Sequence, residues 1–218
     1  MRIIAFGDLH LEPNKAAAIP NITSADLLLV TGDLTNFGGR TEAARMVSVL
    51  RAVNPRLLAL AGNLDRPEVQ EYLETESISL HGRGYLYGDT GIFGVGGSNP
   101  TPFRTPNEFS ETELSALLEQ GFSQVTGASR HILVSHAPPA GTATDRLASN
   151  THVGSRAVRA FIEQYQPDLC LTGHIHEARG SDHIGRTLII NPGMLCRGGW
   201  IEVLATAGAI TAQLHIPG

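Results

Sequence analysis

The chain has 218 residues, 42% of them hydrophobic and 17% charged, which is typical of one globular domain spanning residues 1–218. The formal net charge is −5 and no segment carries a basic run, so we expect no binding of long nucleic acids. No apolar run reaches the roughly 18 residues of a membrane helix. A strand begins almost at Met1, so we also expect no signal peptide and a cytoplasmic location.

Several common site types are absent from the sequence. Cys170 and Cys196 share no short motif, which excludes a zinc ribbon and a C-x-x-C redox centre. The single lysine, Lys15, lies outside any phosphate-binding loop of the P-loop type, and no G-x-S-x-G elbow marks a serine hydrolase.

The first third of the chain alternates strand and helix. Apolar runs at Arg2–Gly7, Asp26–Thr31 and Arg56–Ala61 predict strands, and their continuous rather than alternating character indicates burial on both faces. Helical spacing of apolar residues covers Arg40–Val53, and a second, shorter helix is expected at Pro67–Leu73. This alternation predicts parallel strands.

The rest of the chain mixes hairpins, a long loop and further strand–helix units. Short runs packed between glycines predict hairpins within 78–95, and Ser98–Phe109 is expected to be a surface loop bordering a site. Ser110 and Glu113 form a capping box that opens a helix. The remaining expected elements are a helix at Gly154–Tyr165 and strands at His131–Ser135, Asp168–Thr172, Thr187–Asn191, Trp200–Ala205 and Ile210–Ile216. The pattern predicts a mixed α/β fold.

Polar side chains follow five of the expected strands, at the point where each strand ends. They are Asp8 and His10, Asp33, Asn63, His136, and His174 with His176. Because the carboxyl ends of strands in open α/β sheets line one crevice, we expect these side chains to converge. All of them offer nitrogen or oxygen, which suits divalent transition metals. Seven ligands are too many for one open metal site and suit two ions that share a carboxylate.

The order D-x-H, G-D, G-N-x-[DE], a lone His after a strand, and G-H-x-H resembles the signature of the calcineurin-like metallophosphoesterases, and most closely small prokaryotic single-domain members. The resemblance spans Asp8 to His176. It implies a four-layer α/β/β/α sandwich, in which two packed mixed sheets are flanked by helices.

The resemblance also implies a role for each of these residues. Asp8, His10 and His176 would hold one metal, Asp33 would bridge both, and Asn63, His136 and His174 would complete the second. The implied activity is hydrolysis of a small phosphomonoester or phosphodiester by a hydroxide bridging two divalent ions. We count Asp33, Asn63, Asp65 and His152 as candidate catalytic residues. Mn²⁺ is the preferred ion, and Fe, Zn²⁺, Co²⁺ and Ni²⁺ are alternatives.

The sequence departs from the family pattern at Leu64, where many members have a histidine that protonates the leaving group or steadies the phosphate. Asp65 keeps the acidic position, and we expect it to orient a metal-ligating imidazole. His152 is a candidate for the missing proton donor. It precedes the helix expected at 154–165, whose N-terminus could bind phosphate.

Three further residues are candidates for substrate binding. Asn36, Arg40 and Arg104 lie on segments that could reach a phosphate. The alternative function is a non-catalytic scaffold of the same fold that binds other proteins, and the complete ligand set argues against it. The sequence does not decide whether the protein forms a homo-oligomer.

Overall fold

The computed structural model describes residues 1–217. Its α-helices are α1 (Arg40–Val53), α2 (Pro67–Thr75), α3 (Glu111–Ser123) and α4 (Arg156–Tyr165). Its strands are β1 (Arg2–Phe6), β2 (Leu27–Val30), β3 (Leu57–Ala59), β4 (Arg83–Tyr87), β5 (Thr90–Val95), β6 (Arg130–Ser135), β7 (Leu169–Leu171), β8 (Gly180–Ile184), β9 (Thr187–Asn191), β10 (Trp200–Ala205) and β11 (Ile210–His215). Short 3₁₀ helices lie at Pro13–Ala18, Ile22–Ser24, Ala143–Asp145, His176–Ala178 and Leu195–Arg197.

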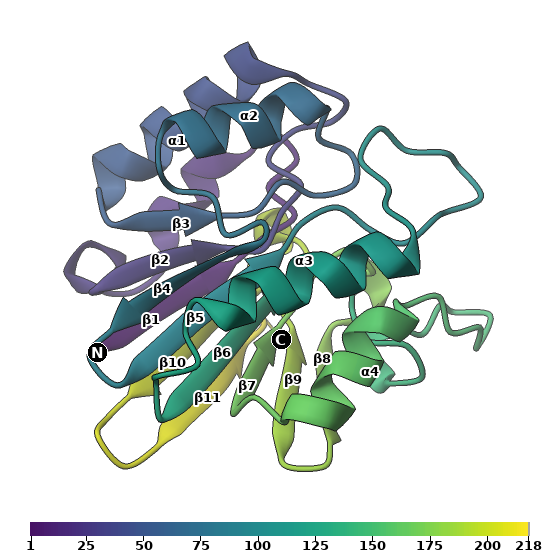
Figure 1. Ribbon diagram of the computed structural model, residues 1–218. Helices are drawn as coiled ribbons and strands as arrows, with labels where there is room; N and C mark the ends of the chain where they lie inside the picture. The colour runs from purple at the N-terminus through teal and green to yellow at the C-terminus, as the bar shows by residue number, and fades with distance from the viewer. Residues whose placement is uncertain (218) are drawn as a thin grey trace.

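The strands form two mixed sheets that pack face to face. One sheet has the order β11-β10-β1-β2-β3 and the other the order β4-β5-β6-β7-β9-β8. Helices α1 and α2 lie outside the first sheet, and α3 and α4 outside the second (Figure 1). Three separate apolar clusters fill the spaces between these four layers. The four-layer α/β/β/α sandwich that the resemblance implied is therefore confirmed.

Strand β1 shows why the central strands read as continuous apolar runs. Ile4 and Phe6 point into the cluster beneath α1 and α2, whereas Ile3 and Ala5 point into the cluster between the two sheets. Successive side chains of a strand face opposite sides, so a strand covered on both faces needs apolar residues at every position. Strands β1, β2 and β3 pair in parallel, as the alternation of strand and helix predicted.

Two segments differ from the sequence-based expectation. Strand β8, Gly180–Ile184, was not predicted, because it is an edge strand with alternating exposure and carries polar residues that form no apolar run. Residues 78–81, expected as a hairpin strand, make only isolated bridges to Ala59 of one sheet and Gly94 of the other. Within residues 78–95 the hairpin consists of β4 and β5.

The parallel strands place their carboxyl ends at one side of the molecule, where the loops that follow them meet. The segment 98–109 carries no helix or strand, as predicted, and joins β5 to α3 as a loop that extends from the body of the protein (Figure 1). The capping box also forms, because the Ser110 hydroxyl accepts from the Glu113 N–H while the Glu113 carboxylate accepts from the Ser110 N–H. Within residues 1–217, no helix has both the length and the apolar character needed to cross a membrane.

Candidate metal centre

Four of the seven candidate ligands have left-handed backbone conformations at the strand ends. The φ angles are +49° at Asp8, +47° at His10, +48° at Asp33 and +68° at His174. Such conformations are uncommon for residues other than glycine and cost about 1–3 kcal/mol each. Their concentration in the loops after β1, β2 and β7 shows that these loops turn sharply, which directs the side chains into one space.

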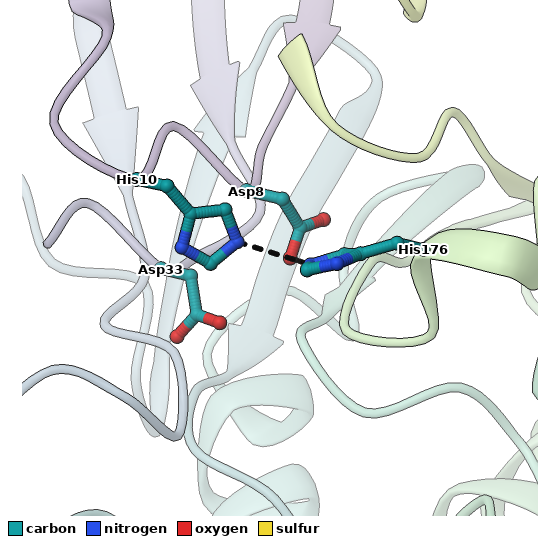
Figure 2. Close-up of side chains that lie close together, drawn as sticks. All are labelled: Asp8, His10, Asp33 and His176. Carbon is teal, nitrogen blue, oxygen red and sulfur yellow. Dashed lines mark hydrogen bonds and ion pairs between the residues drawn. The ribbon is translucent and has the colours of Figure 1, made fainter. Parts of the chain in front are cut away.

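Asp8, His10, Asp33 and His176 form the first group (Figure 2). One ligand atom from each lies within 4.8 Å of the others, so the group could hold a metal ion. The Nε2 atoms of His10 and His176 are 3.0 Å apart, and His176 Nε2 is 3.1 Å from an Asp8 carboxylate oxygen. The side chains come from three loops and point toward one another.

Asn36 fixes the orientation of His10. Its amide oxygen lies 2.7 Å from His10 Nδ1. With that oxygen as acceptor, Nδ1 carries the hydrogen, which leaves the lone pair of Nε2 facing the group. Asn36, expected among substrate-binding residues, thus contacts a candidate metal ligand in this structure.

Asn63, His136 and His174 form a second group beside the first. The amide oxygen of Asn63 lies 3.1 Å from His136 Nε2 and 2.8 Å from His174 Nδ1. Asp33 connects the two groups, because its carboxylate is also 3.6 Å from His136 Nε2. All seven residues predicted from the strand ends therefore come together.

Hydrogen bonds from outside the group orient two of these side chains. His136 Nδ1 lies 2.9 Å from the carbonyl oxygen of Thr31, so Nδ1 donates and Nε2 faces the site. The side-chain amide of Asn63 donates to the hydroxyl of Thr105 at 3.0 Å. That bond identifies which end of the Asn63 amide faces the histidines, namely the oxygen.

The charges at the site act strongly on its imidazoles. Burial lowers the pKa of His136, but the carboxylates of Asp33 and Asp8 outweigh burial and raise that pKa to about 9. Burial, together with the nearby charge of His136, lowers the pKa of His174 to about 4. Without a metal the two neighbouring imidazoles therefore favour opposite protonation states, and a metal ion would compete with the proton on His136.

Glycines and one asparagine hold the loops in place. A Cβ atom at Gly62 would lie 2.1 Å from an Asp33 carboxylate oxygen, and one at Gly173 would lie 2.6 Å from an Asp8 oxygen. The side-chain amide of Asn191 donates to the carbonyls of Gly173 and Ile175, on either side of His174. Because glycine has no side chain, the backbone at Gly62 and Gly173 can lie this close to the carboxylates of Asp33 and Asp8.

The role expected of Asp65 is corrected by its contacts. Its carboxylate accepts hydrogen bonds from the backbone N–H groups of Leu34, Thr35 and Gly62 and from the Thr35 hydroxyl, at 2.7–3.0 Å. These partners occupy the carboxylate, which bonds to no imidazole of the residues that the structure describes. Burial and the charge of Asp33 raise the pKa of Asp65 to about 7. Asp65 thus fastens the Asp33 loop to the Asn63 loop.

A cavity of about 1000 Å³ opens beside the metal groups, and His152 forms part of its wall together with His174 and His176. His152 Nδ1 lies 2.6 Å from a carboxylate oxygen of Asp145. Asp145 is itself buried and accepts from the N–H groups of residues 141, 142 and 154. The pair orients the imidazole of His152 in the same way that a carboxylate orients the histidine of a catalytic dyad.

The two arginines expected to bind substrate differ in how near they lie to the cavity. Within the described residues, the cavity wall contains neither Arg40 nor Arg104. The guanidinium of Arg40 lies 5.4 Å from the centre of the Tyr72 ring, an interaction between helices α1 and α2. Arg104 is exposed on the 98–109 loop, whose residues Phe103 and Thr105 do line the cavity.

The N-terminus of α4 is already filled, which corrects the expectation that it could bind phosphate. The carboxylate of Glu111 accepts from the backbone N–H groups of Arg156 and Ala157 and from the hydroxyl of Ser155. An internal carboxylate therefore occupies the anion-binding position of this helix.

Thr105, Glu108 and Asp145 support the site, and none of them was predicted from the sequence. None of them belongs to a motif or follows a strand, and each acts through a partner that is brought near by folding. For Thr105 and Glu108 the only sequence signal was the length of the 98–109 loop, which indicates function without identifying residues.

The donors present fit divalent metal ions. They comprise two carboxylates, one amide oxygen and four imidazoles, with no thiolate. Hydrogen bonds at Nδ1 of His10 and His136 direct the Nε2 atom of each ring toward the site, and the Nε2 atoms of His10 and His176 approach to 3.0 Å.

Comparison with known proteins agrees with this geometry. The family model described as calcineurin-like phosphoesterase matches residues 1–178. An uncharacterized protein of Methanocaldococcus jannaschii, MJ1162, is 36% identical over 197 residues, which is 88% of each chain.

Solved structures share the fold at low sequence identity. The protein TT1561 of Thermus thermophilus has a TM-score of 0.73 and 17% identity, with 97% of both chains covered. A dimetal phosphatase from Danio rerio has a TM-score of 0.62 and 10% identity, with 98% of this chain and 95% of that chain covered. From the family match and the archaeal relative, we conclude that the chain belongs to the calcineurin-like phosphoesterase family.

Proposed function

We propose that this protein is a metal-dependent phosphoesterase that hydrolyses a small phosphomonoester or phosphodiester. It would use two divalent metal ions, of which Mn²⁺ is the preferred candidate. The observation that carries the proposal is the meeting of two donor groups through Asp33, which contacts both. The first ion would be held by Asp8, His10, Asp33 and His176, and the second by Asp33, Asn63, His136 and His174.

When bound, such a pair of ions would acidify water and neutralise charge on the phosphoryl group. The chain itself supplies the orientation of the ligands. Hydrogen bonds orient three of the ligands: Asn36 orients His10, the Thr31 carbonyl orients His136, and Thr105 orients Asn63. These side chains are therefore oriented before a metal ion binds. Such preorganisation reduces the cost of assembling the site.

We further propose that His152 donates the proton to the leaving group. Leu64 offers no proton at the position where many family members have histidine. His152 lines the same cavity as the metal groups, and the buried Asp145 holds its Nδ1 so that Nε2 is free to face a substrate. A histidine oriented by a carboxylate is a suitable general acid, and such assistance is typically worth 10²–10⁴-fold in rate.

The test compares metal-stripped and Mn²⁺-loaded protein with 4-nitrophenyl phosphate and bis(4-nitrophenyl) phosphate as substrates. We expect turnover that requires metal and is lost in Asp33→Ala, and the ratio of the two rates tells monoesterase from diesterase. If the protein shows no metal binding and no turnover, the proposal is refuted, and the result favours the non-catalytic scaffold.

The role of His152 needs a substrate with a poor leaving group. His152→Asn should slow an alkyl ester by 10²-fold or more and slow a nitrophenyl ester much less, because nitrophenolate leaves without a proton. His183→Asn, at an exposed histidine of β8, is the matched control. Equal losses on both esters would show that His152 is not the proton donor.

A further inference from the structure

The cavity beside the metal groups has a largely apolar wall. The metal residues Asp33, Asn63, His174 and His176 lie along one part of that wall. Half of the other lining residues are apolar, among them Phe37, Leu64, Phe103, Leu147, Val153 and Ile175. At about 1000 Å³ the cavity has the size of a site for a whole small molecule, far more than one phosphoryl group needs.

Two phenylalanines line this cavity with much of their surface exposed. Phe37 is 51% exposed and Phe103 is 85% exposed, and both are among the few large apolar side chains of the described residues that folding leaves open to water. Phe37 follows the Asp33 loop and Phe103 lies on the 98–109 loop, so two separate segments each supply a ring to the same cavity.

The backbone at Phe37 is strained as well as exposed. Its φ angle is +58°, a rare conformation for a bulky residue, and its N–H donates to the Leu64 carbonyl at 3.0 Å. Burial does not offset the cost of this conformation, since half of the side chain remains exposed. Strain kept at a site wall is typical of residues that contact a ligand.

Away from the metal residues, few charged side chains of the cavity wall are available to bind a second ionic group of a substrate. Glu111 is engaged with the N-terminus of α4, and His152 is paired with Asp145. Arg156 is the remaining charged residue of the wall among residues 1–217. A substrate with several phosphates or a charged tail would find one cation here.

From the wall and the two rings we infer that the substrate of this site is a phosphate ester whose organic part is an uncharged aromatic group, seated against Phe37, Leu64 and Phe103 while its phosphoryl group faces the metal residues. The inference rests on the proposed function, because it places the phosphoryl group at the metal end. Aromatic rings stack in offset or edge-to-face geometry, and burial of a ring removes a large apolar surface from water.

The test measures binding of phosphonates, which are not hydrolysed, to the Mn²⁺-loaded full chain by calorimetry. Methylphosphonate, phenylphosphonate and 1-naphthylphosphonate present a similar anionic head with increasing apolar surface. We expect phenylphosphonate to bind about tenfold or more tightly than methylphosphonate, and naphthylphosphonate more tightly still.

The double variant Phe37→Ala/Phe103→Ala should reduce the phenyl-to-methyl affinity ratio to below about threefold. Leu86→Ala removes an exposed apolar side chain of β4 away from the cavity wall and should leave the ratio unchanged. Thermal melting checks that each variant is folded, which we expect because the replaced side chains are exposed.

Each outcome decides between the two proposals. Equal affinities for the three phosphonates in a protein that hydrolyses nitrophenyl esters would overturn the aromatic inference and leave the phosphoesterase standing. A ratio that survives the double variant would also overturn it. Absence of metal-dependent hydrolysis would refute the proposed function, and the inference with it.

Discussion

The hydrogen bond from Asn63 to Thr105 predicts that a loop residue without any motif controls metal affinity. The Thr105 hydroxyl accepts from Asn63 at 3.0 Å and donates to the Glu108 carboxylate at 2.6 Å. The same carboxylate oxygen accepts from the Thr105 N–H and from the Thr101 hydroxyl. Burial raises the pKa of Glu108, but these hydrogen bonds outweigh burial and lower it, so Glu108 is a charged anchor for the loop.

Thr105→Val keeps the shape of the side chain and removes its hydroxyl. Asn63 then loses the acceptor that fixes its amide, and its oxygen is no longer held toward His136 and His174. Changes to residues that orient metal ligands typically cost 10–100-fold in metal affinity. We therefore expect the second of two Mn²⁺ ions to bind 10–100-fold more weakly, which is about 1.4–2.8 kcal/mol, and the first ion to bind as before.

The assay is calorimetric titration of metal-free protein with Mn²⁺. Thr101→Val is the matched control, because it removes another hydroxyl bonded to the same Glu108 oxygen, and the side-chain amide of Asn63 donates to Thr105 rather than to Thr101. Unchanged Mn²⁺ affinity in Thr105→Val would refute the reasoning. An equal loss in Thr101→Val would assign the effect to the loop as a whole rather than to the bond with Asn63.

The structure also predicts the effects of a glycine and a histidine substitution. Gly62→Ala should abolish metal-dependent turnover, since its Cβ would lie 2.1 Å from the Asp33 carboxylate, whereas Gly127→Ala, with no atom within 4 Å of its Cβ, should not; full turnover in Gly62→Ala would contradict the close approach. Burial lowers the pKa of His81 below its ordinary 6.5, and its Nδ1 accepts from a backbone N–H. The imidazole of His81 therefore binds a proton more readily in the unfolded chain than in the folded protein. As a result, the free energy of unfolding should fall as the pH drops below 6.5. His81→Gln should reduce that fall in urea titrations at pH 5 and 7, and the exposed His183→Gln should not; identical pH dependence in wild type and His81→Gln would contradict the assignment.

The short-range pattern of the sequence was enough to identify the seven candidate ligands. Each follows an apolar run, and parallel strands align their carboxyl ends, so residues as distant as Asp8 and His176 could be assigned to one site before any contact was known. The buried strands were predictable for the same reason, because a strand covered on both faces must be apolar at every position.

Tertiary structure alone decided what surrounds those ligands. Thr105 is 42 residues from Asn63, and Glu111 is 45 residues from Arg156, the first residue of the helix that it caps. From the sequence we expected Asp65 to bond to an imidazole and the N-terminus of α4 to be able to bind phosphate. Instead, Asp65 accepts from backbone N–H groups, and the carboxylate of Glu111 caps the N-terminus of α4. Periodicity reports which face of an element is buried, but a single hydrogen bond between distant loops leaves no periodic trace, so the residues that orient the ligands and shape the cavity emerge only when the chain is folded.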